Sequence, residues 1–454
     1  MSIIADIAAA DYTRKLEGGL IARWSTAADT ENIAELVSLV FREKEEDEPN
    51  KHIANIARIL MSGTTPVMGP GDYALVEDPH KEGNPIVAGV CLQRMEWFYE
   101  GIPFLMSRPE IVAADPAYRN RGLIRTLFEF VHARGAAEGR LVDAITGIYY
   151  FYRQFGYEYA LSLEGMRGIY LPAIPKAKEG EAEAYTLREA TLEDVPRLHE
   201  IYTQHIGTGY AITTNIDENY LRWELEAWKD HPERTKFSTT QLIVKADGSI
   251  QGWFYARARR RTSSLNVWAL YLASHVNLQA IMPPLLRALQ NYGQQIPTEK
   301  PDAGAFSEIK FYLGESHPFY EVIDKLATIK EPSYAWYVRV ADLPKFIQHI
   351  APALEKRLLG SLVEGYSGEL KLDFYRSGLR MVFEQGRLTT VENWRSTVLN
   401  NTADGGFPPL VFLKALFGYR TLNELRQAYP DAWVNNEVLF NTLFPAKPSL
   451  AIPL

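Results

Sequence analysis

The stretch that decides the fold spans residues 111–125 and reads IVAADPAYRNRGLIR. The apolar run from Ile111 to Ala114 predicts a buried strand, and Pro116 marks the loop that ends it. From Leu123 onward, apolar residues recur at helical spacing. The sequence therefore predicts a strand, a sharp turn and a helix in direct succession.

This turn has the chemistry of an anion site. Gly122 has no side chain, so the backbone there can approach a bound group closely. The first N–H groups of a helix are unpaired within the helix, and the helix dipole favours negative charge beside them. Arg119, Arg121 and Arg125 can neutralise phosphate groups through charge-assisted hydrogen bonds. For the turn taken alone, a solvated arginine cluster at a helix start is the alternative interpretation.

Length and charge limit the classes of protein to consider. A chain of 454 residues suggests roughly two to four domains. Its 46% hydrophobic and 23% charged residues are ordinary globular values, so disorder is not expected to dominate. A formal net charge of −8 argues against nucleic acid or an anionic membrane as a partner and suits a cationic, amine-bearing substrate.

Cysteine and histidine usage gives no sign of a metal site. The single cysteine, Cys91, lies in an apolar run and is interpreted as a buried small hydrophobic residue rather than a reactive thiol. The nine histidines are scattered without metal-ligand spacing, so no metal is expected. The N-terminus lacks a signal-peptide pattern, and no apolar run is long enough to span a bilayer. We expect a soluble, cytoplasmic protein.

The chain contains a diverged internal duplication. A segment rich in proline, glycine and charge predicts a linker over residues 173–184. A strand follows it, and then Thr191 with Asp194 three residues later, which predicts a capped helix like the one that starts at Thr26. Where the second copy should have the glycine turn, residues 271–279 read YLASHVNLQ, with neither glycine nor arginine.

The predicted fold class is α/β (α+β), with mixed, largely antiparallel sheets flanked by helices. The expected segments are a leader (1–17), a first domain (18–172), the linker (173–184), a second domain (185–341) and a third domain (342–454). The third domain is predicted to open with one helix over residues 346–359, followed by alternating strands and two further helices. Its last eleven residues contain three prolines and are expected to be extended.

The glycine turn resembles that of the GCN5-related N-acetyltransferase (GNAT) superfamily, whose pattern is Gln/Arg-x-x-Gly-x-Gly/Ala. Arg119 and Gly122 match it, whereas Ile124 replaces the small last residue. Residues 151–157, which read FYRQFGY, resemble a second element of the superfamily. The arginine-rich turn and the three-domain order resemble the enhanced-intracellular-survival (Eis) branch. This resemblance implies tandem GNAT folds, of which the second is degenerate, and a C-terminal domain like sterol carrier protein (SCP2-like).

The resemblance also implies how acetyl-CoA would be held. The strand edge at Val112, Ala113 and Ala114 would pair with the pantetheine amides. The phosphates would be held by Arg119, Asn120, Arg121, Gly122, Leu123, Ile124 and Arg125. Gly147 and Ile148 would lie where the sheet opens. Acetyl-CoA is thus the expected co-substrate, and no metal is needed.

Direct attack of an amine on a thioester needs a proton acceptor for the amine and a proton donor for the departing thiolate. By resemblance Tyr152 is the general acid, with a packing aromatic as the alternative role. The base implied by the Eis branch is the terminal carboxylate, which here belongs to Leu454 rather than to the phenylalanine of that branch. A frayed terminus is the alternative, and Glu43, Glu45 or Glu46 would then attract the amine or relay its proton.

These features together predict an N-acetyltransferase. The resemblance implies a small aminoglycoside- or polyamine-like substrate with a primary amine, and a symmetric homo-oligomer that is often hexameric. An enzyme that acetylates a protein or peptide amine is one alternative. A non-enzymatic acyl-CoA- or lipid-binding protein that works through its third domain is the other.

Overall fold

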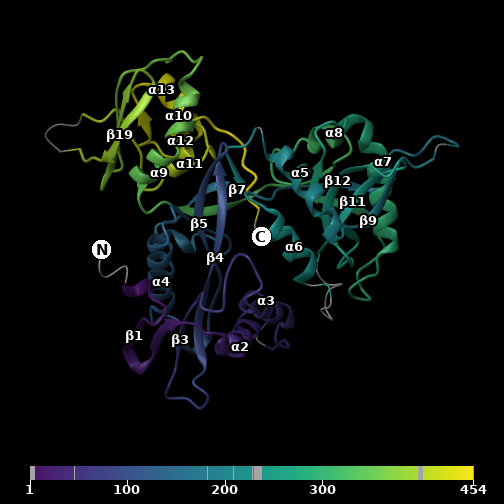
Figure 1. Ribbon diagram of the computed structural model, residues 1–454, viewed down its shortest axis with the longest axis horizontal. Helices are drawn as coiled ribbons and strands as arrows, with labels where there is room; N and C mark the ends of the chain where they lie inside the picture. Colours follow the sequence, from purple (N-terminus) through teal and green to yellow (C-terminus); the bar gives the residue numbers. More distant parts are fainter. Residues whose placement is uncertain are drawn as a thin grey trace. The chain divides into compact units, whose positions relative to one another are not determined.

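The computed structural model describes residues 6–44, 46–180, 182–207, 209–227, 229, 238–396 and 402–452. The chain forms two compact units, Met1–Leu161 with Trp336–Lys447 and Ser162–Ala335 with Pro448–Leu454. Figure 1 labels many of the helices and strands of both. Within the described ranges, no helix is long and apolar enough to cross a membrane.

The first unit is built on a large mixed sheet. Its strands, in spatial order, are β1 (Thr13–Lys15), β2 (Ile21–Trp24), β3 (Tyr73–Glu77), β4 (Ile86–Tyr99), β5 (Ile102–Ala114), β6 (Val142–Ile145), β16 (Tyr334–Arg339) and β7 (Glu158–Leu163). Neighbours from β1 to β5 are antiparallel, and β6 joins β5 in parallel. β1 is a strand that the sequence analysis did not predict.

Strand β4 is the centre of this sheet, and the first eight of its residues are all buried. A strand covered on both faces is expected to read as an unbroken apolar run, as β4 does. Helices α2 (Thr30–Val40) and α4 (Leu123–Ala137) both pack on it. Cys91 in this strand is fully buried, which confirms its predicted role in the core. Burial also raises the pKa of its thiol.

The second unit has its own seven-stranded sheet. Its order is β15 (Ile329–Glu331), β8 (Met166–Tyr170), β14 (Glu308–Tyr312), β13 (Ser264–Leu272), β12 (Ile250–Arg257), β11 (Ser238–Lys245) and β9 (Tyr185–Glu189). The helices of this unit are α5 (Val195–Ile206), α6 (Glu218–Ala227), α7 (Leu278–Gln295) and α8 (Phe319–Ile323). The short strand β10 (Ile212–Thr214) forms a bridge to Leu450 of the C-terminal tail.

The two units repeat one another in detail, which supports the duplication read from the sequence. Capping boxes formed by Thr26 with Asp29 and by Thr191 with Asp194 lead into α2 and α5. Each acid also binds an arginine on the preceding strand: Arg23–Asp29 is 2.7 Å and Arg188–Asp194 is 2.6 Å. In each sheet the strand that pairs in parallel (β5 or β13) is followed by the longest helix of its unit among the described residues.

A third sheet, also within the first unit, runs in the order β19 (Arg387–Asn393), β18 (Gly378–Glu384), β17 (Gly368–Asp373), β20 (Gly405–Gly406) and β21 (Trp433–Val434). Its helices are α9 (Leu343–His349), α10 (Ala351–Leu358), α11 (Phe412–Leu416), α12 (Leu422–Ala428) and α13 (Glu437–Leu443). The single helix predicted over residues 346–359 is wrong. Pro352 lies in the first turn of α10. Because proline cannot donate a helical hydrogen bond, the predicted helix is interrupted at Ile350 and continues as two separate helices.

This third sheet and its helices are fixed to the end of β4 by polar contacts. The Tyr99 hydroxyl donates to the carbonyl of Leu416 at 2.7 Å. Glu100 accepts from Arg357 at 3.0 Å and from Lys447 at 2.7 Å. Because these contacts are largely shielded from water, they tie the third sheet to the first more firmly than exposed pairs would.

Candidate active site

The sheet of the first unit opens beyond the middle of β5. The parallel pairing between β5 and β6 covers Met106–Val142 and Ser107–Asp143. Strand β5 then continues to Ala114, and within the described residues this last part has no partner in β6. A strand edge that leaves its neighbour in this way can accept an extended ligand as an additional strand.

A β-bulge marks the point of opening. Gly89 pairs with Ala113 and Cys91 with Glu110, so Ile111 and Val112 together face one residue of β4. Ile111 has a φ of 47°, a conformation that is rare for a β-branched residue. Strained residues of this kind concentrate at functional sites. The sequence did not reveal the bulge, because isoleucine ordinarily favours a regular strand.

The turn after β5 adopts the conformation that the sequence predicts. Gly122 is the N-cap of α4 and has a φ of 72°, and Asn120 has a φ of 63°. A Cβ atom placed on Gly122 would meet nothing within 4 Å, so the positive φ rather than crowding is what favours glycine there. Both residues are exposed, and the first N–H groups of α4 therefore face a region open to a ligand.

The three arginines of the turn are exposed around this helix start. Arg119 donates through Nε to the carbonyl of Ala114 at 3.4 Å. Arg121 lies over the ring of Tyr118 at 5.1 Å, and Arg125 over that of Phe155 at 5.3 Å. These contacts keep all three guanidinium groups close to the turn, where they create a local positive field in an acidic protein.

Tyr152 lies next to the opening in the sheet. Its side chain is 3% exposed and packs between the rings of Phe128, at 5.7 Å, and Tyr337, at 5.4 Å. A Cβ atom placed on Gly147 would lie 4.0 Å from the Tyr152 hydroxyl. The structure thus brings together two residues that the sequence analysis had assigned to the site separately.

The comparison that identifies this region is with protein families. Residues 22–160 match the family model described as "Acetyltransferase (GNAT) domain". Residues 22–160 form a GNAT acyltransferase domain. No curated protein sequence matches the chain significantly.

Solved structures share the fold of this chain over most of its length. A conserved protein of unknown function from Enterococcus faecalis V583, described as a probable N-acyltransferase, has a TM-score of 0.67 at 13% identity and covers 96% of this chain and 99% of its own. Eis1 from Mycobacterium abscessus has a TM-score of 0.58 at 14% identity, covering 95% and 99%. N-myristoyltransferase from Saccharomyces cerevisiae, solved with myristoyl-CoA, has a TM-score of 0.53 at 11% identity, covering 72% and 84%. These likenesses show the fold alone, a mixed α/β architecture consistent with tandem GNAT folds and an additional α/β domain.

The remaining predicted site residues of the GNAT domain are placed as follows. Ala113 is buried, Val112 and Ala114 are partly buried on β5, and Ile148 is 61% exposed in the loop after β6. Glu43 and Glu46 are exposed between α2 and α3 (Lys51–Met61). Leu454 and Glu45 lie outside the described residues, so their predicted roles stay predictions.

Glu110 lies at the candidate site, and the sequence analysis did not single it out. Its carboxylate accepts from Arg108 at 2.9 Å and from the Thr146 hydroxyl at 3.2 Å. Its second oxygen accepts from the backbone N–H of Ile111 at 3.2 Å. Glu110 therefore links β5 to the end of β6 at the point where the two strands part. The available signal was an acidic residue directly before an otherwise apolar strand segment.

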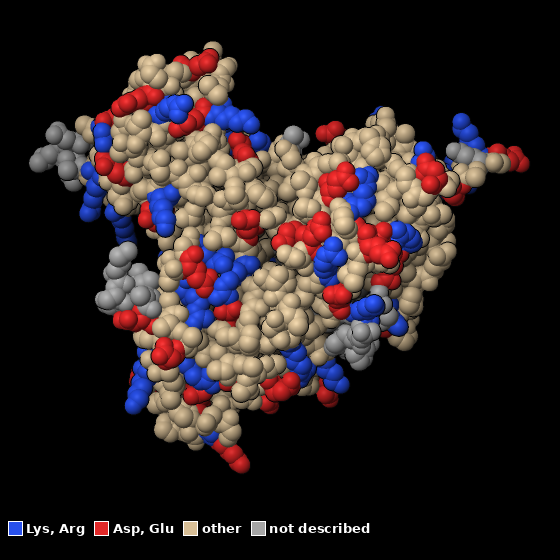
Figure 2. All heavy atoms as spheres, in the orientation of Figure 1, with Lys and Arg blue, Asp and Glu red and all other residues tan. Residues whose placement is uncertain are grey.

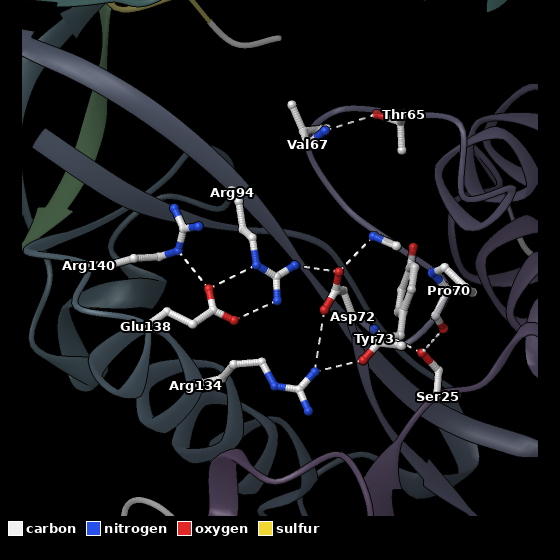
Figure 3. Close-up of polar contacts among 12 residues, drawn as sticks. Ser25, Thr65, Val67, Pro70, Asp72, Tyr73, Arg94, Arg134, Glu138 and Arg140 are labelled. Carbon is white, nitrogen blue, oxygen red and sulfur yellow. Dashed lines mark hydrogen bonds and ion pairs between the residues drawn. The ribbon is translucent and has the colours of Figure 1, made fainter. Parts of the chain in front are cut away.

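A partly buried ionic network holds the other end of α4 (Figure 3). Arg94 on β4 pairs with Asp72 and, at 2.6 Å, with Glu138 at the end of α4. Arg134 on α4 donates to the carbonyl of Gly71 at 2.7 Å and lies 3.4 Å from Asp72. Because the network fixes α4 against β3 and β4, it also fixes the direction in which the N-terminus of α4 points.

The second GNAT fold lacks the corresponding helix start. Its α7 is capped by Asn277, whose side chain accepts from the N–H of Ala280 at 3.0 Å. This hydrogen bond uses one of the N–H groups at the start of α7. At the start of α4, no side chain caps the helix, and the equivalent N–H groups are left for a ligand. This is a physical reason to expect phosphate binding in the first fold alone.

Charge on the protein surface is mixed. Figure 2 shows acidic and basic side chains interspersed over the face in view, with wide uncharged areas between them. An extended basic surface, the usual footprint of nucleic-acid binding, is not visible on this face.

Proposed function

We propose that the first GNAT domain transfers acetyl from acetyl-CoA to a primary amine of a small cationic acceptor, of aminoglycoside or polyamine type. The observation that supports this most is the meeting of three features on one side of the sheet. They are the open edge of β5 at the Ile111 bulge, the helix start at Gly122 and the Tyr152 hydroxyl beside Gly147. The net charge of −8 suits a cationic acceptor.

The described residues fit acetyl-CoA. Val112 and Ala114 would offer backbone groups to the pantetheine amides, and the N–H groups from Leu123 onward would receive the phosphates, with Arg119, Arg121 and Arg125 supplying positive charge. Acetyl-CoA supplies the thioester. The amine nitrogen bonds to its carbonyl carbon, the carbon–sulfur bond breaks, and the Tyr152 hydroxyl gives its proton to the departing sulfur.

A direct test is acetyl-CoA-dependent release of free thiol in the presence of an amine panel. We expect release with aminoglycosides or polyamines, and little with a lysine-containing peptide. Preferential turnover of the peptide would move the proposal to protein acetylation. Binding of acetyl-CoA without release by any amine would contradict the proposal altogether.

The proton acceptor for the amine is proposed to be the terminal carboxylate of Leu454. The tail is described as far as Ile452, whose N–H donates to the Thr214 hydroxyl at 2.9 Å within the second unit. Leu450 forms a bridge with Thr213. These contacts fix the tail two residues before its end, which would limit the positions that the carboxylate can reach.

Deleting Leu454 moves the terminal carboxylate back to Pro453. Because a misplaced general base loses its contribution of about 10²- to 10⁴-fold, kcat is expected to fall by about 10²-fold or more. The matched control is Leu454→Phe, which keeps the carboxylate at the same chain position and should retain activity. Steady-state kinetics across a pH range measures both. Unchanged kcat after the deletion would show that no carboxylate is needed at position 454, and Glu110 would become the favoured acceptor.

The finer features of the resemblance belong to the same proposal. The domains are taken as residues 18–172, 185–341 and 342–454, the last being SCP2-like. The protein is proposed to be cytoplasmic and to assemble as a symmetric homo-oligomer, such as a hexamer. The three sheets support three domains, but strands are exchanged near the proposed bounds: β8 belongs to the second sheet and β16 to the first.

A further inference from the structure

The second GNAT fold has a cavity at the same place where the first fold opens. In the second unit the parallel pairing of β13 with β14 covers Ser264–Val267 and Glu308–Phe311. A cavity with a volume of about 360 Å³ is lined by the residues that follow on both strands, 268–271 and 312–314. A β-bulge at Trp268 accompanies the opening, as the bulge at Ile111 does in the first fold.

Aromatic side chains form much of the wall of this cavity. Trp268 stacks on Tyr312 with ring centroids 4.3 Å apart and an interplanar angle of 22°. Trp253 and Tyr271 lie 4.5 Å apart, and Tyr255 also lines the space. Aromatic faces gathered around a small space attract organic cations, because each ring carries partial negative charge above its plane.

Carboxylates complete the cavity wall. Glu224 of α6 and Glu164 both line it. Burial raises the pKa of Glu224 to about 7, and a hydrogen bond from the Tyr255 hydroxyl partly offsets that rise. A partly desolvated carboxylate of this kind gains most from a positive ligand placed beside it.

Two basic residues also line the cavity, and both are engaged. Arg257 lies 3.5 Å from Glu299. His317 contacts the Leu270 carbonyl at 2.9 Å through Nε2 and accepts from the Phe319 N–H at 3.1 Å through Nδ1. Burial lowers the pKa of His317 to about 3, so the ring is neutral at physiological pH. Glu299 is shared between Arg257 and Arg261, at 3.5 Å and 3.7 Å, and burial raises the pKa of Glu164 as it does that of Glu224. A cation bound in the cavity would favour the ionised form of both lining glutamates.

The C-terminal tail closes one side of the cavity. Residues 449–452 line it and are held there by Thr213 and Thr214 of β10. The cavity is therefore bounded by the α6 helix, the opened strands and the tail, all within the second unit.

We propose that this cavity is a binding site for a small organic ammonium ion. Its aromatic wall would contact the alkyl groups and the charge, and the two carboxylates would supply the opposite charge. A volume of about 360 Å³ is at the lower end of the range for small-molecule sites, which suits a compact ligand. The proposal rests on residues of the second unit and does not require acetyltransferase activity.

Isothermal titration of the full-length protein with choline, at constant ionic strength, tests the proposal. The matched probe is 3,3-dimethyl-1-butanol, which has the shape of choline without the charge. Choline is expected to bind saturably, and the alcohol at least about tenfold more weakly, which corresponds to about 1.4 kcal/mol. Equal binding of the two would show an apolar cavity, and absence of saturable choline binding would overturn the proposal.

Variants locate the binding. Glu224→Gln should weaken choline binding about tenfold and leave the alcohol unaffected. Glu226→Gln, an exposed position on the same helix, is the control and should bind choline normally. Tyr255→Leu, which removes an aromatic face from the cavity, serves as a second cavity variant if Glu224→Gln melts early, and it should also weaken choline binding.

The same titration separates this proposal from the acetyltransferase one. Choline has no primary amine, and Tyr152→Phe should bind it like the wild type. Undiminished choline binding by both cavity variants would contradict the site, whatever the result of the thiol-release assay.

Discussion

Replacing Tyr152 by phenylalanine is expected to lower kcat for amine-dependent thiol release by about 10²- to 10⁴-fold, the usual contribution of a general acid. The substitution removes one hydroxyl and keeps the ring, which packs against Phe128 and Tyr337. Acetyl-CoA affinity should change little, because the proposed phosphate and pantetheine contacts lie on β5 and the turn. Steady-state kinetics and a separate titration with acetyl-CoA measure the two quantities.

The pH profile distinguishes a general acid from a packing residue. If the phenol protonates the departing thiolate, its loss should remove the alkaline limb of the kcat profile. Tyr170→Phe is the control: it removes an exposed hydroxyl from β8 in the second unit and should leave kcat unchanged. A Tyr152→Phe variant with normal kcat, or one whose loss of activity follows only a lower melting temperature, would assign Tyr152 to packing.

The glycine turn was predictable because its signal is local. A positive φ at Gly122 follows from residue type and position, as does the helix from Leu123. The duplication was equally readable, since Thr191 and Asp194 repeat the spacing of Thr26 and Asp29. Both depend on contacts within a few residues of one another.

The bulge at Ile111 and the role of Glu110 were not predictable in this way. Both depend on which residue of β4 faces β5, and on the point at which β6 leaves the sheet. These are properties of register between strands, and no propensity of the bulged residues encodes them. The broken helix at Ile350 is different, because Pro352 gave a local signal that the apolar spacing around it outweighed.

The two GNAT folds show how one opening in a sheet can acquire different chemistry. In the first, the strands part beside an uncapped helix start with three arginines. In the second, Asn277 caps the helix, and the opening is lined with aromatic rings and carboxylates. The first arrangement favours an anion and the second a cation, although the backbone framework is the same. Loss of the glycine turn in the second copy is thus compatible with a different ligand.

The largest expected effect on stability comes from Asp72→Ala. Asp72 pairs with Arg94 and Arg134, whose side chain is 8% exposed, and it also accepts from the N–H of Gly69 at 2.7 Å. Removing one partner of a buried ion pair leaves the opposite charge uncompensated, which costs about 3–5 kcal/mol. Burial already lowers the pKa of Arg134 to about 10, so this charge depends on its partners.

Because the chain contains more than one cooperative unit, global unfolding does not give a single free energy. Hydrogen exchange resolved by segment is the suitable measurement, and protection should fall in α4 and β4 while that of the second unit stays constant. Glu31→Ala is the matched control, since this acid is 72% exposed and pairs with Arg58 at 2.7 Å on the surface. Such pairs contribute about 0–1 kcal/mol.

The same variant links the network to function. Since α4 carries the proposed phosphate site at one end and the network at the other, Asp72→Ala should also weaken acetyl-CoA binding, whereas Glu31→Ala should not. Acidification below the ordinary glutamate pKa should have a related effect on the wild type. Burial alone would raise the pKa of Glu138, but hydrogen bonds from Arg94 and Arg140 lower it overall. The ionised Glu138 therefore contributes its full stabilisation above the ordinary glutamate pKa. This stabilisation is lost as the pH falls through the lowered pKa of Glu138 in the folded protein. Protection of α4 that is unchanged by either treatment would show that packing on β4, and not the ionic network, holds the helix in place.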